Sequence, residues 1–389
     1  MHIFVPREGK SGERRVAIVP DVVSKYIRAG FTVAVENGAG VHAQADDASF
    51  TAVGAEIVSA TGISSADVIL SVNPLTAAQF ASVKKGAITI SFLSPNQSLD
   101  SIGAAAKAGA TAFSLELVPR ISRAQSMDAL TSQALCAGYR AALVAAELSP
   151  RFFPLLMTAA GTVTPANVVV LGAGVAGLQA IATARRLGAV VSAYDVRPAS
   201  ADEVRSMGAT FIDLKLEALE GAGGYAREMT EERAAKQREL LTPYLANADV
   251  VITTAAVPGR PAPRLVTEEM VAAMKPGSVI VDLAAESGGN VAGALPGEIV
   301  EKNGVRIWGG KDVPSQLAFH ASQLFAKNCM NLLLLMVKSE SDANGSTKSS
   351  LHLDFDDEII AASAVTHEGE VRHEGARASL ANGASGGAR

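Results

Sequence analysis

The chain has 389 residues, of which 48% are hydrophobic and 19% charged, and its 34 basic and 39 acidic side chains give a formal net charge of −5. This length exceeds one ordinary domain, and the apolar content argues against disorder over most of the chain. A slightly acidic chain has no general attraction for nucleic acid, so nucleic acid is not expected as a partner. Two cysteines cannot form a disulfide framework, which indicates a reducing compartment.

The amino terminus and the apolar runs argue against export and against a membrane span. The first residues lack the basic start and apolar stretch of a signal peptide. The longest uncharged apolar runs are far shorter than the roughly 20 residues that cross a bilayer. We therefore expect a cytoplasmic protein.

The first third of the chain alternates short β-branched runs with helical stretches, which is the pattern of a parallel sheet with crossover helices. This unit has no glycine-rich phosphate loop. Strands are expected at Ile3–Val5, Phe31–Val35, Val68–Val72, Ile88–Ser91 and Thr111–Ser114, and helices at Pro20–Arg28, Leu75–Val83 and Leu99–Ala108.

A long helix is predicted over Ser126–Leu148, where apolar residues recur at helical spacing until Pro150. We interpret it as a bridge to a second α/β series. The strands of that series are expected at Val168–Leu171, Val190–Tyr194, Val250–Thr253, Ser278–Asp282 and Arg306–Ile307.

The last part of the chain is expected to return to the first domain through a long helix at about Ser315–Lys338. Leu351–Val365 can form a hairpin, and the Gly-, Ala- and Ser-rich end predicts a flexible tail over 375–389. The fold class is thus α/β, with two Rossmann-like domains joined by long helices. Residues 1–131 with 316–389 form the first domain, and 132–315, which include the bridging helix, form the second.

A dinucleotide-binding fingerprint lies at the start of the second series. Gly172, Gly174 and Gly177 have the G-x-G-x-x-G spacing, with a predicted strand before them and a helix, Ala176–Leu187, after them. The first glycine permits the tight turn, the second lets the backbone approach a pyrophosphate, and the third lets the helix pack on its strand. Val175 and Ala176 complete the expected pyrophosphate-binding turn, because amides at a helix amino terminus bind anions.

An acidic residue ends the next strand, about 20 residues further on, as the fingerprint requires. Asp195 would accept hydrogen bonds from a ribose 2′-hydroxyl and repel a 2′-phosphate, which favours NAD(H) over NADP(H). Arg197 leaves an alternative open, since an arginine near this place can bind a 2′-phosphate. We include both residues among the cofactor-binding candidates, together with Ala255, which follows the strand Val250–Thr253.

The sequence resembles the alanine dehydrogenase/transhydrogenase family, and within it the NAD(H)-binding components of proton-translocating transhydrogenases. The resemblance covers essentially the whole chain. Its blocks include Glu116-Leu-Val-Pro-Arg120-Ile-Ser-Arg123-Ala-Gln125-Ser-Met-Asp128, Gly172–Gln179, Lys275-Pro-Gly-Ser-Val-Ile, Asp282-Leu-Ala-Ala-Glu286-Ser-Gly-Gly and Leu324-Phe-Ala-Lys-Asn.

The resemblance implies a homodimer that transfers a hydride directly from bound NADH to NADP⁺ held by a partner subunit, coupled to proton movement through separate membrane-spanning subunits. Such a chain would be peripheral on the cytoplasmic face of the inner membrane, which it would reach through its partners. Two nearly equivalent nicotinamides need alignment and exclusion of water more than acid or base catalysis.

The resemblance also assigns a loop around the nicotinamide. Arg120, Gln125 and Asp128 would frame the ring and its ribose, with an Arg120–Asp128 pair holding the loop, and Thr131 or Ser132 would contact the carboxamide. A mobile segment within Lys215–Arg238 would close on the nucleotide and bring Tyr225 against the nucleotide or the partner; a lone tyrosine is equally typical of surface packing.

Two alternatives remain open at this point. Alanine dehydrogenases use an arginine, a lysine, a histidine and an aspartate; here Arg15 matches the arginine, while Asn73, Ser94 and Glu286 stand at the other three places. Without the lysine and histidine, amino-acid oxidation lacks its acid–base groups. A non-catalytic NAD(H)-binding protein is the second alternative, because no nucleophile–base pair stands out. The six histidines have no metal-ligand spacing, so no metal is expected.

Overall fold

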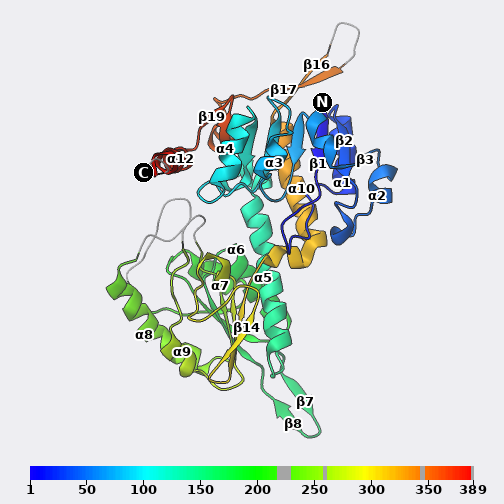
Figure 1. Cartoon of the computed structure of the whole chain (residues 1–389). Coiled ribbons are helices and arrows are strands. Elements are labelled where there is room, and N and C mark those ends of the chain that lie inside the picture. The colour runs from blue at the N-terminus through cyan, green and yellow to red at the C-terminus, as the bar shows by residue number, and fades with distance from the viewer. Residues whose placement is uncertain (217–228, 257–260, 342–346, 387–389) are drawn as a thin grey trace. The chain divides into compact units, whose positions relative to one another are not determined.

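The computed structural model describes residues 1–216, 229–256, 261–341 and 347–386, and the chain divides into two compact units (Figure 1). Unit 1 comprises Met1–Gln133 and Leu317–Arg389, and unit 2 comprises Ala134–Gln316. Each unit is built on a sheet whose strands are mainly parallel, which confirms the predicted α/β class with two Rossmann-like units. No helix among the described residues is both long enough and apolar enough to cross a membrane.

Unit 1 contains an eight-stranded sheet in the order β19-β18-β6-β5-β4-β1-β2-β3. Alternate side chains of β1 enter two separate cores, since Ile3 and Val5 pack in one cluster and Phe4 in the other. Strands β1 to β6 pair in parallel, while β18 pairs antiparallel to β6 and β19. The strands are β1 (His2–Val5), β2 (Thr32–Glu36), β3 (Glu56–Val58), β4 (Val68–Leu70), β5 (Ile88–Ser91), β6 (Thr111–Ser114), β18 (Ala364–His367) and β19 (Glu370–Val371).

Helices cover both faces of the unit 1 sheet, and α10 contributes buried side chains to the same core as β1. Proline at the first position of α1 suits a helix start, because that position has no helical partner for an N–H group. The α-helices are α1 (Pro20–Arg28), α2 (Asp47–Ala52), α3 (Ala77–Phe80), α4 (Leu99–Lys107), α10 (Ala318–Leu335), α11 (Glu358–Ser363) and α12 (Glu374–Gly386). A hairpin of its own joins β16 (Val337–Ser341) to β17 (Thr347–Leu351).

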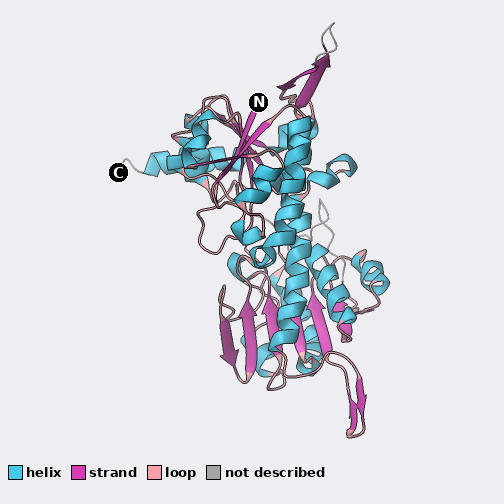
Figure 2. Cartoon of the chain, turned by 90° about the vertical axis from the view of Figure 1, so that its right-hand side faces the viewer, coloured by secondary structure: helices cyan, strands magenta, loops and turns pink. Residues whose placement is uncertain are grey.

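Unit 2 contains a seven-stranded sheet in the order β11-β10-β9-β12-β13-β15-β14, in which only β14 runs antiparallel among the described strands. The carboxyl-terminal half of α5 crosses one face of this sheet (Figure 2), and its buried alanines share a core with β9 and β10. The strands are β9 (Asn167–Leu171), β10 (Val190–Tyr194), β11 (Thr210–Phe211), β12 (Val250–Thr253), β13 (Val279–Asp282), β14 (Ile299–Lys302) and β15 (Val305–Gly309).

The helices of unit 2 connect these strands in the manner of a doubly wound fold. They are α5 (Ala129–Leu148), which begins in unit 1, α6 (Val175–Arg186), α7 (Ser200–Ser206), α8 (Glu231–Asn247) and α9 (Glu268–Ala272). A second core on the other sheet face includes Leu241 of α8 and Met270 of α9. Strands β7 (Leu156–Thr158) and β8 (Gly161–Val163) form a separate hairpin that extends away from the sheet (Figures 1 and 2).

The strand order places the topological switch point of unit 2 between β9 and β12. Strand β10 follows β9 on one side, whereas β12 lies on the other side. In open parallel sheets, ligands bind in the crevice outside the carboxyl ends of the two strands at such a point. Residues that follow Leu171 and Thr253 therefore line the expected crevice.

The structure departs from the sequence predictions near the end of the chain. The hairpin predicted for Leu351–Val365 is wrong: this stretch contains α11, β17 pairs backward with β16, and β18 joins the main sheet. The local alternation of apolar and polar residues does not indicate which strand β18 pairs with, and in the structure that strand is β6. Most of the stretch predicted as a flexible tail forms α12, whose Ala376 is fully buried, and residues 387–389 lie outside the described residues. The flexibility of this end stays a prediction.

Candidate dinucleotide site

The glycine turn between β9 and α6 has the geometry that each of its glycines was predicted to supply. Gly172 has φ +100°, a region that glycine enters without strain. A Cβ on Gly177 would overlap the carbonyl oxygen of Gly172, so only glycine lets α6 pack this closely. A Cβ on Gly174 would meet nothing within 4 Å, which leaves open space beside the backbone where a pyrophosphate would lie. The turn therefore fits a dinucleotide.

Helix α6 begins directly above this open space. Gly174 is its N-cap, and Val175 and Ala176 are its first two residues, so the amides of the first turn lie beside the glycine turn. Helix α5 supports the turn from behind, because a Cβ on Gly138 would overlap the carbonyl oxygen of Ala176. No sequence pattern predicts this supporting role for Gly138.

Asp195 and Arg197 form one hydrogen-bonded group at the end of β10. The Asp195 Oδ1 atom accepts from the backbone N–H of Arg197 and from its Nε, both at 2.9 Å, and Oδ2 accepts from the Arg197 Nη2 at 3.0 Å. Oδ2 also accepts from the backbone N–H of Ala173 at 2.7 Å, inside the glycine turn. The hydrogen bond to Asp195 is the main cause that raises the pKa of Arg197.

These four bonds occupy the lone pairs of the Asp195 carboxylate. A ribose hydroxyl that binds there must displace one of them, and the Arg197 side chain, which is 23% exposed against 7% for Asp195, is the movable partner. The pair thus brings the predicted ribose acceptor next to the predicted glycine turn. It also keeps the Arg197 side chain bonded to the acid at the end of β10.

The end of β12 forms the other wall of the switch point. The Thr254 hydroxyl donates to the Gly172 carbonyl at 3.0 Å, and the Ala255 N–H donates to Asn290 Oδ1 at 3.1 Å. Ala255 is therefore held beside the glycine turn, as its predicted role requires. Thr254 and Asn290 were not predicted. For Thr254, its position directly after a strand at the switch point was a usable signal.

The remaining predicted contacts belong to unit 1, at the start of α5. Asp128 caps the helix: its Oδ1 accepts from the Thr131 N–H at 2.8 Å and its Oδ2 from the Thr131 hydroxyl at 2.6 Å. Ser132 donates to Asn328 Oδ1 at 2.7 Å. These contacts give Asp128 a helix-capping role, whereas the predicted Arg120–Asp128 pair stays a prediction.

Gln125 and Arg120 lie in the loop that precedes this cap, and both are exposed. Gln125 belongs to a short 3₁₀ helix, Ser122–Met127. That segment is fastened to α11 by Arg123, whose two terminal nitrogens bond the Asp357 carboxylate at 2.7 and 2.8 Å. This bond from Arg123 is the main cause that lowers the pKa of Asp357.

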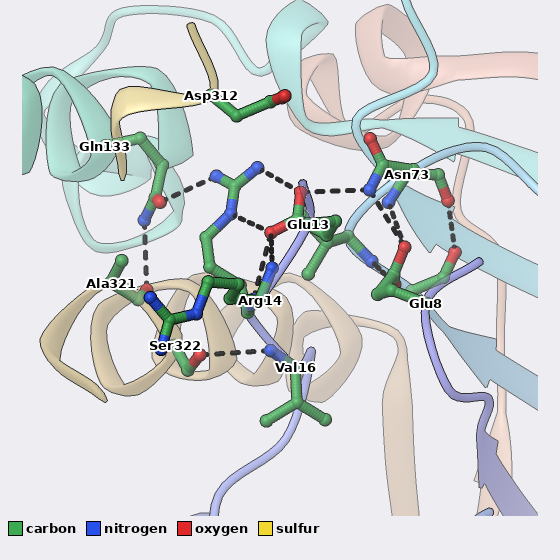
Figure 3. Close-up of polar contacts among 12 residues, drawn as sticks. Glu8, Glu13, Arg14, Val16, Asn73, Gln133, Asp312, Ala321 and Ser322 are labelled. Carbon is green, nitrogen blue, oxygen red and sulfur yellow. Dashed lines mark hydrogen bonds and ion pairs between the residues drawn. The ribbon is translucent and has the colours of Figure 1, made fainter. Parts of the chain in front are cut away.

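A second polar cluster in unit 1 contains Glu8, Glu13, Asn73 and Gln133 (Figure 3). Arg15 belongs to the same cluster through its hydrogen bonds. Its guanidinium bonds both oxygens of Glu13, Nε to Oε1 at 2.8 Å and Nη2 to Oε2 at 2.6 Å, and its Nη1 bonds Gln133 Oε1 at 2.9 Å. Arg15 is 8% exposed and Glu13 7%. The arginine that would bind a substrate carboxylate in an alanine dehydrogenase therefore binds a carboxylate of its own chain.

Asn73 and Ser94 are also engaged within unit 1. The Asn73 amide donates to Glu8 at 2.9 Å and to Glu13 at 3.0 Å, and the Ser94 hydroxyl bonds Glu116 at 3.3 Å. Burial raises the pKa of the Glu8 carboxyl, although its hydrogen bonds to Asn73 and Val72 oppose the shift. None of these groups supplies the lysine and histidine that amino-acid oxidation needs.

The predicted site residues thus fall in two groups. Gly172, Gly174, Gly177, Asp195 and Ala255 meet in unit 2, and Arg120, Gln125, Asp128, Thr131 and Ser132 share one loop and helix start in unit 1. Tyr225 lies outside the described residues. Glu286, at the aspartate position, accepts from the Asp312 N–H at 2.8 Å. Across the described part of the chain, no group of three or more His, Cys, Asp or Glu residues could hold a metal ion.

A doubly wound unit with a glycine turn and an acid at the end of its second strand defines a dinucleotide-binding α/β protein. Residues 4–137 match the family described as "Alanine dehydrogenase/PNT, N-terminal domain", and residues 141–374 match "Alanine dehydrogenase/PNT, C-terminal domain". The chain belongs to the alanine dehydrogenase/PNT family. This confirms the resemblance identified from the sequence.

Relatives of both activities are found. An NAD(P) transhydrogenase alpha-subunit polypeptide of Rhodospirillum rubrum is 49% identical over 96% of this chain and 98% of its own length. The alanine dehydrogenase of Mycobacterium tuberculosis is 34% identical over 76% of each chain. Among solved structures, a transhydrogenase from Sinorhizobium meliloti has a TM-score of 0.83 and 44% identity, covering 96% of this chain and 99% of its own.

Proposed function

We propose that this chain is the NAD(H)-binding subunit of a proton-translocating NAD(P) transhydrogenase, in which a hydride passes directly between NADH and NADP⁺ bound on a partner subunit. The observation that carries the proposal is the glycine turn bonded to Asp195, in a chain 49% identical over nearly its whole length to a transhydrogenase subunit. Homologous proteins are named as subunits of a transhydrogenase, so we include partner subunits in the proposal.

The residues of this chain bind and orient the dinucleotide. The bound nicotinamide supplies the hydride chemistry. Gly174 leaves space for the pyrophosphate, the first amides of α6 bind it, and Asp195 takes the ribose hydroxyls. Arg120, Gln125 and Asp128 frame the nicotinamide, with Thr131 or Ser132 at the carboxamide and Tyr225 at the nucleotide or the partner. Alignment of two nearly equivalent rings needs no general acid or base from the protein.

The second candidate, amino-acid oxidation as in alanine dehydrogenase, is supported by Arg15 and by the 34% identity to an alanine dehydrogenase. That arginine bonds Glu13 and Gln133, and Asn73 and Ser94 cannot act as a general acid or base at neutral pH. We therefore place it second. A non-catalytic NAD(H)-binding protein would use the same nucleotide site. It would differ only in that bound NADH would not transfer its hydride to an acceptor.

One set of measurements separates these functions. The purified chain is expected to bind NADH more tightly than NADPH, to aminate no pyruvate, and to transfer hydride to NADP⁺ only after the NADP(H)-binding component is added. Pyruvate amination by the chain alone would establish the alanine dehydrogenase function. Tight NADH binding with no transfer in the presence of the partner component would leave only the binding role.

We further propose that the chain is a homodimer that associates through the β7–β8 hairpin. The hairpin and the segment before it expose Phe152 by 61%, Leu155 by 55% and Met157 by 79%, which is unusual for large apolar side chains in water. An isolated two-stranded hairpin is marginally stable, so a second copy packed on this arm would account for it. Sedimentation should give a dimer for the native chain and a monomer for Met157→Glu, and an unchanged dimer in that variant would exclude this arm.

Attachment to the membrane is proposed to occur through the partner subunits, with the chain peripheral on the cytoplasmic face of the inner membrane. The described helices include none that could cross the bilayer. The chain's formal charge of −5 also provides no general attraction to anionic lipid. Binding to inner-membrane vesicles should accordingly depend on the presence of the partner subunits.

A further inference from the structure

Asn290 is a fully buried amide in unit 2, and all of its side-chain hydrogen-bonding atoms contact one loop. It is 0% exposed. Its Oδ1 accepts from the Ala255 N–H at 3.1 Å, and its Nδ2 donates to the carbonyl oxygens of Ala255 and Pro263, both at 2.8 Å. One side chain therefore links Ala255 to Pro263.

The backbone of Asn290 is itself held by Leu265 and Val266, next to the isolated bridge between Val266 and Val291. Its carbonyl oxygen accepts from the N–H groups of Leu265 at 2.8 Å and Val266 at 2.9 Å. The next residue, Val291, donates its N–H to the buried Asp282 at 3.0 Å, at the end of β13. The other oxygen of that carboxylate accepts from the Thr253 hydroxyl at 3.0 Å. The amide thus extends from a rigid base toward Ala255.

Ala255 lies at the switch-point crevice. Its neighbour Thr254 bonds the Gly172 carbonyl, and a Cβ built on Gly172 would come within 3.2 Å of the Ala255 nitrogen. In this fold the adenosine ribose lies at the end of the second strand, here at Asp195, and the pyrophosphate lies on the glycine turn. The β12 side of the crevice is left for the nicotinamide half.

We propose that Asn290 is a positioning residue for the nicotinamide half of the dinucleotide: it holds the backbone of Ala255 in place before the nucleotide binds. It acts through Ala255 and does not itself contact the nucleotide. The amide suits this task because it accepts from an N–H group and donates to two carbonyls at once, a combination that asparagine supplies and a carboxylate cannot. This inference rests on the proposed NAD(H) site, and it names a residue within that site on which binding of the nicotinamide half depends.

The test compares two ligands that share the adenosine half. Asn290→Ala leaves the N–H group of Ala255 and the carbonyls of Ala255 and Pro263 without their partner, so Ala255 is no longer held. We expect its affinity for NADH to fall about tenfold, while its affinity for ADP, which reaches only Asp195 and the glycine turn, changes by less than about twofold. Equal losses for the two ligands, or no loss for NADH, would overturn the proposal.

Two further measurements allow the proposal to be tested even if Asn290→Ala does not fold. Asn290→Ser preserves more packing and should show the same selective loss if Asn290→Ala fails to fold. In the unmodified chain, the Ala255 N–H should exchange slowly with solvent before any nucleotide is added, and fast exchange would show that Ala255 is not held in advance.

Asn247→Ala is the matched control. Asn247 also donates its amide to a backbone carbonyl of unit 2, that of Pro243 at 2.9 Å, but it precedes β12 and so lies at the opposite edge of the sheet. It should bind both ligands normally. If the native chain failed to prefer NADH, the proposed function would fail; if it binds NADH and the Asn290 variants lose both ligands alike, only the present inference fails.

Discussion

At the scale of single residues, the Asp195–Arg197 pair places an acceptor for ribose hydroxyls and a donor for a 2′-phosphate side by side in the proposed site. The carboxylate and the guanidinium neutralise each other, with the nearest atoms 2.9 Å apart. The acid holds the arginine, and in the proposed site it would accept ribose hydroxyls and disfavour a 2′-phosphate. Substitution of Asp195 and substitution of Arg197 should therefore change the coenzyme preference in different ways.

We predict that Asp195→Ala reverses the preference for NADH. The variant loses charge-assisted hydrogen bonds worth about 1.5–3 kcal/mol, so its NADH affinity should fall roughly 10- to 100-fold. The released Arg197 can then bond a 2′-phosphate, so NADPH affinity should rise. Titration of the variant with both coenzymes measures the two constants.

Asp202→Asn is the matched control, because Asp202 is 93% exposed and bonds only Arg205 on its own helix. Its affinities should equal those of the native chain. An Asp195→Ala variant that loses NADH and NADPH affinity alike would show that Arg197 does not reach a 2′-phosphate.

At the scale of elements, the position of α6 depends on the helix behind it. Gly138 of α5 leaves no room for a Cβ, since that atom would overlap the Ala176 carbonyl oxygen in the first turn of α6. The clash is with backbone, which cannot rotate away as a flexible side chain can. A change on α5 should therefore displace the pyrophosphate-binding amides.

We predict that Gly138→Ala destabilises the chain by about 1–3 kcal/mol, the usual cost of overpacking, and weakens NADH binding in the same variant. Denaturant unfolding and NADH titration measure the two effects. Gly103→Ala is the control: Gly103 lies inside α4, and the nearest atom to its Cβ would be 3.7 Å away. Because alanine favours helix, that variant should gain about 0.5–1 kcal/mol. Equal stability of the two variants would contradict the clash.

The elements also show what a sequence can predict. Helix α1 and strands β5, β6 and β10 have the predicted bounds, because each has strong local periodicity and a clear end signal. Strand β18 was missed, since its partner β6 lies about 250 residues earlier and no local pattern records that pairing. Asn290 was missed for the same reason: its three bonds reach residues 27 and 35 positions away.

The predicted site shows the same division. The glycine turn and Asp195 are found from spacing alone because the fold requires those residues at fixed offsets. The four-bond arrangement of Asp195 could not be found in this way, since it depends on where the Arg197 side chain turns back. Asp128 was identified from family resemblance as a loop residue, while its bonds to Thr131 follow from ordinary helix capping.

At the scale of the whole molecule, each unit has two hydrophobic cores. The single tryptophan of the sequence provides a fluorescence probe of one unit only. The four hydrophobic clusters of the described residues divide evenly, two in unit 1 and two in unit 2. The single tryptophan of the sequence, Trp308, lies in β15 of unit 2 and is 8% exposed. Its fluorescence therefore reports the unfolding of the unit that carries the glycine turn, whereas circular dichroism reports both units.

We predict that NAD⁺ raises the unfolding midpoint seen by Trp308 fluorescence more than the midpoint seen by circular dichroism. A ligand that binds only the native state stabilises it by about 2.7 kcal/mol at a free concentration about 100 times its Kd. The proposed pyrophosphate and ribose contacts, at Gly174 and Asp195, lie in unit 2, so we expect the larger share of that stabilisation there. The Asp195→Ala variant is the control and should show little shift at the same NAD⁺ concentration. Equal shifts by the two probes would mean that the units unfold together, because then stabilisation of one unit must be shared by the other.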